Sequence, residues 1–70
     1  MSSIVKVIEV LGQSEKGFDD AARSVVKEVS KTVKNIRSVW LDNFQCKVEG
    51  DRIVQFRVNA KVSFAVEGHQ

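Results

Sequence analysis

Apolar and polar residues alternate without interruption along the stretch from Val54 to Val66. One set of alternate positions is entirely apolar: Val54, Phe56, Val58, Ala60, Val62, Phe64 and Val66. The first five positions between them are polar: Gln55, Arg57, Asn59, Lys61 and Ser63. Because successive side chains of a strand point to opposite faces, the pattern predicts a strand with one face on a core and the other toward water, a ligand or another subunit. At about 3.3 Å per residue this strand is roughly 40 Å long, so we expect part of it to extend beyond its own subunit's core.

The stretch from Ser3 to Leu11 also predicts a strand, since it is short and rich in Val and Ile. Both of its faces are partly apolar. One face carries Val5, Val7 and Leu11, and the other carries Ile4, Ile8 and Val10. In so small a protein, this pattern indicates that a second subunit covers the side that a helix does not.

A turn at Gly12 and Gln13 leads into a predicted helix of about 20 residues, with Ser14 as its N-cap. Apolar positions recur in this segment at three- and four-residue spacing: Phe18, Ala22, Val25, Val29, Val33 and Ile36. A basic stripe faces the other way: Arg23, Lys27, Lys31 and Lys34. The pattern is typical of a helix that packs one face on a sheet. The basic stripe indicates a solvated face rather than a nucleic-acid surface, because no interleaved aromatic residues accompany it.

A second strand is predicted from Ser38 to Val48, and its apolar face changes partway along. The odd positions carry Val39 and Leu41, and the even positions carry Trp40, Phe44, Cys46 and Val48. We therefore expect a bulge or a strong twist near Asp42 and Asn43, or a strand that leaves its own helix for a neighbouring subunit.

The segment Glu49–Arg52 predicts a hairpin turn in which Gly50 supplies a positive φ, so the third strand runs antiparallel to the second. Together these elements predict an α+β fold with β-α-β-β connectivity. One helix packs on a twisted three-stranded antiparallel sheet, with strand order 1-3-2. The chain shows no linker and no repeat, and residues 1–70 are expected to form a single domain.

Because the chain is small, we also expect it to associate with copies of itself. A domain of 70 residues buries only about 60% of its unfolded surface, so its core is marginal on its own. The single cysteine, Cys46, cannot form an internal disulfide, and no Cys/His cluster offers a zinc site. A closed symmetric homo-oligomer is the expected source of further stability.

Charge and chemistry exclude several classes of protein. The 11 Lys and Arg residues nearly balance the 9 Asp and Glu residues, which indicates no nucleic-acid partner. No segment approaches the roughly 20 apolar residues that span a membrane, and a free thiol without a signal-like stretch favours the cytoplasm. No catalytic triad, carboxylate pair or phosphate loop is recognisable, so we expect no enzyme. Because the only histidine is His69, Cys46 is interpreted as a small buried side chain rather than a nucleophile.

Two segments carry a family resemblance: KVIEVLGQS from Lys6 to Ser14, and FRVNAKVSFAVEG from Phe56 to Gly68. With the amphipathic helix between them, they resemble the dodecins, which are small β-α-β-β proteins. The most specific parts are the strand-Gly-x-Ser entry to the helix and the terminal run of Val62, Phe64, Val66 and Glu67. The resemblance covers nearly the whole chain. It implies a hollow homododecamer that binds small molecules, in many members a flavin such as riboflavin, FMN or FAD.

The chain departs from the flavin-binding members at the ligand. In those members a Trp early in the second strand stacks on the isoalloxazine ring, and a Gln in the third strand bonds its edge. Aligned on the motifs above, the Trp position is Ser38 and the Gln position is Arg57. Trp40 and Gln55 each lie two residues away on the same strand face, so the candidate site comprises Ser38, Trp40, Gln55 and Arg57.

Two members of this set, the aromatic Trp40 and the charged Arg57, each have two interpretations. Trp40 either stacks on a planar ligand or fills an interface between subunits. Arg57 either holds a phosphate or carbonyl group, or pairs with Asp42 or Glu9 of another subunit.

Two hypotheses about function follow. In the first, the protein is a storage module that sequesters flavin. In the second, it is a flavin-less cage with a structural or calcium-binding role, because dodecins associated with calcium also carry Arg in the third strand.

Overall fold

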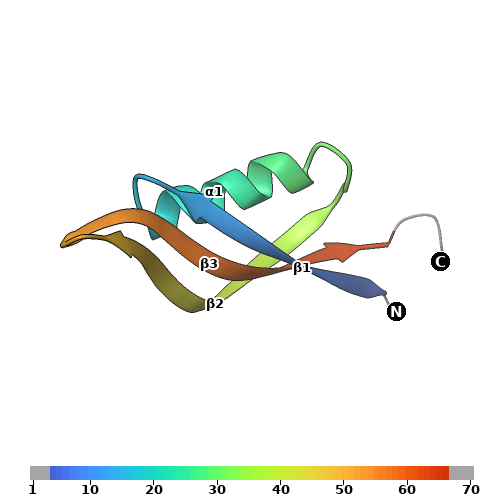
Figure 1. Ribbon diagram of the computed structural model, residues 1–70. Helices are drawn as coiled ribbons and strands as arrows, with labels where there is room; N and C mark the ends of the chain where they lie inside the picture. Colours follow the sequence, from blue (N-terminus) through green and yellow to red (C-terminus); the bar gives the residue numbers. More distant parts are fainter. Residues whose placement is uncertain (1–3, 67–70) are drawn as a thin grey trace.

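The computed structural model describes residues 4–66. Its elements are β1 (Val5–Ser14), α1 (Phe18–Val29), β2 (Ile36–Glu49) and β3 (Arg52–Ala65). This order confirms the predicted β-α-β-β connectivity, and α1 lies across one face of the sheet (Figure 1). The fold class predicted from the sequence is therefore correct.

The three strands form one antiparallel sheet in the order β1-β3-β2, as predicted. Strand β3 lies in the centre because β1 and β2 run in the same direction and the hairpin reverses the chain between β2 and β3. Gly50 has a φ of 66° in the hairpin turn. The molecule measures 55 × 20 × 13 Å, since the β2–β3 hairpin projects well past the helix (Figure 1).

The core lies between α1 and the middle of β3. Val58, Ala60 and Val62 of β3 are fully buried, and Ala21 and Val25 of α1 pack in the same layer. Partly buried residues from β1, α1 and β2 surround this centre: Ile8, Val10, Val29, Ile36, Val39 and Leu41. The alternation that begins at Val54 thus places the helix-facing side of β3 in the core, as expected.

A bulge interrupts β2 at the position that the change of apolar face predicted. Asp42 is opposite Asn59, but the next regular pair is Gln45 with Arg57. Two residues of β2 therefore face one residue of β3, and Asn43 adopts a φ of 55°, a left-handed conformation that Asn tolerates. The bulge explains why the helix-facing positions change from odd to even along β2.

Three phenylalanines join the far half of the hairpin to the start of the helix. The ring of Phe18 meets Phe44 edge-on, with 5.1 Å between centroids, and Phe56 in the same way at 5.2 Å. Such edge-to-face pairs add stabilisation beyond the area that they bury. Beyond them the hairpin has no cover within the described chain, and Cys46, which was expected to be buried, is exposed.

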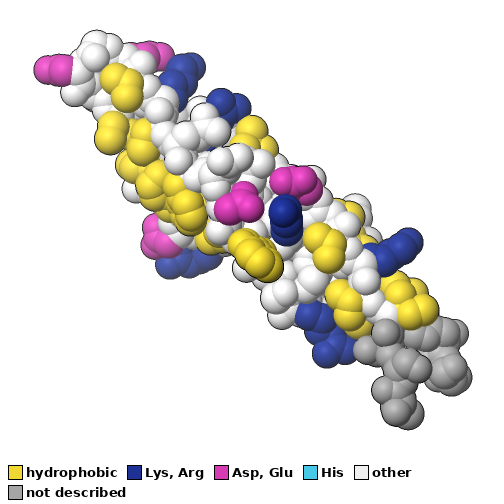
Figure 2. Space-filling model, turned by 90° about the horizontal axis from the view of Figure 1, so that it is seen from below, with side chains coloured by type: hydrophobic (Ala, Val, Ile, Leu, Met, Phe, Trp, Pro, Cys, Tyr) yellow, Lys and Arg dark blue, Asp and Glu magenta, His cyan; other side chains and the backbone are white. Residues whose placement is uncertain are grey.

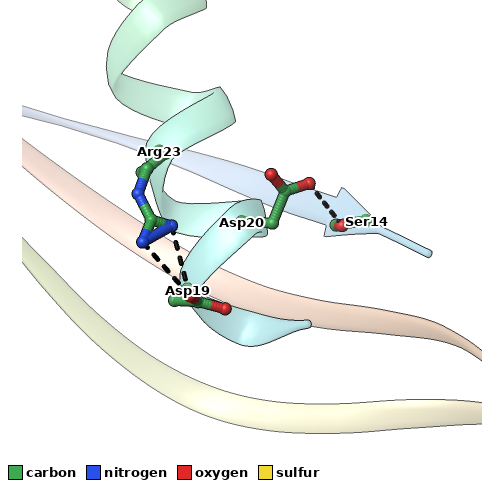
Figure 3. Close-up of polar contacts among 4 residues, drawn as sticks. All are labelled: Ser14, Asp19, Asp20 and Arg23. Carbon is green, nitrogen blue, oxygen red and sulfur yellow. Dashed lines mark hydrogen bonds and ion pairs between the residues drawn. The ribbon is translucent and has the colours of Figure 1, made fainter. Parts of the chain in front are cut away.

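The predicted N-cap at Ser14 is wrong. Strand β1 continues through Ser14, which pairs with Phe56, so the helix begins only at Phe18 with Gly17 as its N-cap. The Ser14 hydroxyl accepts a hydrogen bond from the Lys16 amide at 2.9 Å. It also donates one to Asp20 Oδ2 at 2.6 Å (Figure 3). Ser14 therefore links β1 to α1 through its side chain while it remains paired with Phe56 of β3.

The helix is also shorter than predicted, with 12 residues instead of about 20. The Ser30 hydroxyl bonds the Lys27 carbonyl at 2.9 Å, and the Thr32 hydroxyl bonds the Val29 carbonyl at 3.4 Å. Ser and Thr side chains that bond nearby carbonyls favour the end of a helix over its continuation. The apolar spacing nevertheless persists beyond Val29, because Ile36 packs on the core from the start of β2. The predicted basic stripe is also interrupted, because Lys31 and Lys34 lie beyond the end of the helix.

The strand bounds differ modestly from those predicted. The predicted start of the first strand at Ser3, and Glu67, Gly68 and His69 near the C-terminal end, lie outside the described residues. The predicted apolar character of both faces of β1 is confirmed. Ile8 and Val10 pack on the core, while Val5, Val7 and Leu11 are exposed on the other face.

We predict that Gly12→Ala destabilises the fold by about 1–3 kcal/mol through overpacking. A Cβ at this position would lie 2.7 Å from Val25 Cγ2 and 3.0 Å from the Ala21 carbonyl oxygen, so the helix would have to move off β1. Urea unfolding at one fixed protein concentration measures the effect. The double variant Gly12→Ala/Val25→Ala should lose less stability than the two single variants added together, because the shorter side chain makes room. Simple additivity would contradict the proposed clash.

Candidate functional site

The candidate residues lie on the sheet face remote from the helix, which we call the outer face. The pairing register defines it, because residues directly opposite each other on antiparallel strands share a face. Its rows cross the sheet as Gln13–Arg57–Gln45, Leu11–Asn59–Asp42, Glu9–Lys61–Trp40 and Val7–Ser63–Ser38. Gln55 lies on the same face opposite Lys47. All four predicted site residues therefore occupy one surface, as expected from the face assignment of β3.

The outer face combines apolar side chains with both signs of charge (Figure 2). Its large exposed apolar residues come from the two edge strands, with exposed fractions of 51% for Val5, 58% for Val7, 48% for Leu11 and 70% for Trp40. The central strand contributes polar and charged side chains between them. A contiguous mixture of this kind is typical of a surface that meets a partner or a ligand.

Trp40 is the most exposed of these apolar residues and lies opposite Lys61. In the next row the hydroxyls of Ser38 and Ser63 are 2.6 Å apart, and the Ser63 hydroxyl also lies 3.5 Å from the Ser38 carbonyl oxygen. Ser38 therefore presents a small hydrogen-bonded pair where the flavin-binding relatives are expected to have an indole. Any stacking surface at this end of the outer face must come from Trp40.

Arg57 lies between Gln13 and Gln45 and is half-buried. Its Nε is buried and has no hydrogen-bond partner among residues 4–66. Arg57 makes no ion pair within the described chain, and its salt bridge to Asp42 or Glu9 of another subunit stays a prediction. Because an unpaired buried donor costs free energy, the arrangement favours an acceptor supplied from outside.

The acidic residues of the outer face lie in other rows. Asp42 and Glu9 flank the central strand at Asn59 and Lys61, and the Asn59 amide donates to Glu9 Oε2 at 3.4 Å. The outer face thus carries Arg57 in one row and the carboxylates in the rows that follow.

A single chain does not bring the predicted site residues into one cluster. Trp40 is in the row of Lys61, four β3 residues from Arg57, a separation of roughly 13 Å at about 3.3 Å per residue. Gln55 lies one row beyond Arg57, farther from Trp40. A ligand that contacts both the indole and the guanidinium must therefore either span several rows or lie between two chains.

The sequence prediction missed the residues that surround each candidate. Gln13 and Gln45 border Arg57, Lys61 borders Trp40, and Ser63 holds Ser38. Counting outward from the hairpin turn at Gly50 would have found the partners of β2 only approximately, because the register shifts by one residue at three places along β2. No signal in the sequence fixed the register of β1, which depends on strand order and packing.

Among residues 4–66, no group of three or more His, Cys, Asp or Glu side chains is placed to hold a metal ion. Within the same residues, no helix has the length and apolar character that crossing a membrane requires.

A family model described as Dodecin matches residues 4–67, and the chain belongs to the dodecin family. Dodecin from Streptomyces davaonensis is 22% identical, with 97% of this chain and 100% of that chain covered and a TM-score of 0.90. Dodecin from Streptomyces coelicolor is 25% identical, with 96% of each chain covered and a TM-score of 0.89. The calcium dodecin from Mycobacterium tuberculosis, described as calcium chelating, is 28% identical, with 97% of each chain covered and a TM-score of 0.79. No curated protein matches the sequence.

We predict that the single tryptophan reports directly on the outer face. In a dissociated chain Trp40 is 70% exposed, so its fluorescence should be red-shifted and readily quenched by acrylamide. If a second copy or a ligand covers the outer face, the emission should shift to the blue and the quenching should fall. Emission that is the same in dilute dissociated chains and in concentrated protein would show that Trp40 stays in water.

Proposed function

We propose that this dodecin is a binding and storage protein that sequesters a flavin, namely riboflavin, FMN or FAD, between the outer faces of neighbouring subunits. Trp40 stacks on the isoalloxazine ring. Arg57 or Gln55 bonds the polar edge of the ring, and the Ser38–Ser63 pair borders the space beside the indole. The ligand is held without chemical conversion, so the protein is not an enzyme.

One observation carries the proposal: a largely exposed indole shares a face with a guanidinium whose Nε has no partner in residues 4–66. An indole offers a planar apolar surface, and a guanidinium offers several donors in one plane. A planar heterocycle with carbonyl oxygens on its edge matches both groups. The distance of roughly 13 Å between their rows supports a site built from two chains.

Self-assembly supports the same arrangement. The outer face exposes Val5, Val7 and Leu11 together with Trp40, and covering them would bury apolar surface that a 70-residue chain cannot cover by itself. Membership of the family makes a hollow homododecamer the assembly that we propose. In that assembly the carboxylates of Asp42 and Glu9 become available to the Arg57 of another copy.

A calcium-binding cage is the second candidate, because one structural relative is described as a calcium dodecin. The described residues of one chain offer no group of three ligand side chains. Calcium prefers six to eight oxygen ligands, so a calcium site here would have to combine oxygens from several chains. Asp42 is the carboxylate best placed for this, since it lies on the outer face beside Asn59.

We predict that the purified chain sediments as a closed oligomer, with a dodecamer as the expected size. The reason is the apolar area of the outer face and the uncovered half of the hairpin. Analytical ultracentrifugation at micromolar concentration tests the prediction. A monomer under these conditions would contradict the assembly and the two-chain ligand site together.

We predict that added riboflavin loses its fluorescence on binding and that Trp40→Ala weakens binding by about 1–3 kcal/mol, the usual contribution of one stacked aromatic contact. Titration of riboflavin against wild type and variant, followed by flavin emission, measures this loss. Lys27→Ala is the control, because Lys27 is exposed in the last turn of α1, on the other side of the sheet from the outer face. A protein that never quenches riboflavin but retains calcium through dialysis would favour the second candidate.

The variant Arg57→Gln separates the two interpretations of the guanidinium. If Arg57 pairs with a carboxylate of another subunit, the variant should assemble less well, and its amide should raise the affinity for the flavin edge. If Arg57 instead binds the ligand's phosphate, the oligomer should persist and FMN affinity should fall more than riboflavin affinity. Unchanged size and unchanged affinities would show that the guanidinium is merely solvated.

A further inference from the structure

Lys61 is the charged side chain next to Trp40 on the outer face. It lies on the central strand β3, directly opposite Trp40 of β2 on one side and Glu9 of β1 on the other. Directly opposite residues on antiparallel strands have Cβ atoms about 4.5–5.5 Å apart. The side chain of Lys61 is long enough to span that distance, so its ammonium group reaches the border of the indole. A ring stacked on Trp40 therefore has Lys61 along one edge.

The ammonium group of Lys61 has no ion-pair partner in the part of the chain that the structure describes. The ion pairs found among residues 4–66 lie in and just after α1 or near the hairpin turn. Glu9, its neighbour across the ladder, instead accepts a hydrogen bond from the Asn59 amide at 3.4 Å. Lys61 is also exposed. Its charge is thus available to a ligand.

The other cation at the centre of β3 is too far from the indole to play the same role within one chain. Arg57 lies four residues from Lys61 along the strand, roughly 13 Å at about 3.3 Å per residue. A ring on Trp40 reaches Arg57 only by spanning several rows or by meeting a second chain. Within a single chain, Lys61 is therefore the nearest charged contact for such a ring.

The polar neighbours of Lys61 along β3 are already engaged. The hydroxyls of Ser63 and Ser38 are 2.6 Å apart, and Asn59 donates to Glu9. An ammonium group has three donors and no acceptor. The chemistry beside the indole therefore favours a ring edge that accepts hydrogen bonds, and a negatively charged acceptor forms the strongest of these bonds.

We propose that Lys61 selects the ligand of the outer face by charge, so that the site prefers a planar aromatic ring that carries a carboxylate. The inference rests on the proposed stacking at Trp40 and adds the chemical class of ring that the site prefers. The ring stacks on the indole, and its carboxylate pairs with the ammonium group of the same chain. This pair needs no residue of a second chain, in contrast to a contact with Arg57.

Glu9 limits the preference, because its carboxylate lies on the other side of Lys61 and repels an anion. It is farther from the indole by one strand spacing, about 4.8 Å, so the attraction of Lys61 is the larger effect. Removing the charge of Glu9 should therefore strengthen the binding of an anionic ring. A purely structural role for Glu9 gives the opposite sign.

Titration of the purified protein with phenazine-1-carboxylate and with phenazine-1-carboxamide tests the proposal. The two probes share one ring skeleton and differ in charge at neutral pH. Quenching of the fluorescence of Trp40, the only tryptophan, measures both affinities. Wild type should bind the carboxylate about fivefold more tightly, the upper value for an ion pair in contact with water, and the preference should fall at high salt.

Variants assign the preference to one side chain. Lys61→Gln should bind both probes equally, and Lys61→Arg should keep the preference because it keeps the charge. Glu9→Gln should raise the affinity for the carboxylate and leave that for the carboxamide unchanged. Lys27→Gln is the matched control, since Lys27 is exposed in the last turn of α1, on the other side of the sheet. An equal loss of preference in Lys27→Gln would reduce the effect to net charge and overturn the proposal.

Riboflavin, titrated in parallel, separates this inference from the flavin proposal. A wild type that binds riboflavin but does not distinguish the two phenazines keeps the proposed function and overturns the role of Lys61. A wild type that binds the carboxylate but not riboflavin supports selection by charge and overturns the flavin assignment. Binding of neither phenazine, or a preference that persists in Lys61→Gln, overturns the inference whatever riboflavin does.

Discussion

The contact between α1 and the centre of β3 is the constraint on which the rest of the molecule depends. Val58, Ala60 and Val62 are fully buried, and the close approach of the helix to Gly12 leaves no space for even a methyl group there. Once these side chains face the helix, strand geometry sends Arg57, Asn59 and Lys61 to the outer face. The candidate site is therefore a direct consequence of how the core packs.

The same contact leaves part of the described chain without cover. The helix has only 12 residues, whereas β2 and β3 have 14 residues each, so the hairpin extends past its cover. The apolar residues of β1 are divided between two faces, and only one face receives a helix. In the assembly that we propose, this uncovered surface lies against other copies, which would add stability to a domain of this size.

The alternation of apolar and polar residues made the sheet predictable. The ends of the helix depend on local side-chain hydrogen bonds, which the spacing of apolar residues does not reveal. Strict alternation in β3 predicted its two faces, the change of phase in β2 indicated an irregularity near Asp42 and Asn43, and the hairpin with the strand directions predicted the strand order. Ser14 remained in the ladder because its pairing with Phe56 outweighed its preference for a cap. Side-chain bonds from Ser30 and Thr32 ended the helix although the apolar spacing continued. At the site, the positions of Ser38, Trp40, Gln55 and Arg57 on one face were predictable, but the partners of Arg57 and the distance to Trp40 required the register.

The bulge at Asn43 also determines where evolution can change the length of this chain. One residue is already absorbed there without a partner, so removing it would leave Asp42 opposite Asn59 and Gln45 opposite Arg57. An insertion or deletion within a regularly paired stretch of either strand shifts the register by one and exchanges core residues for surface residues. At Asn43 the hairpin can therefore lose its unpaired residue while the hydrophobic core and the outer face both keep their residues.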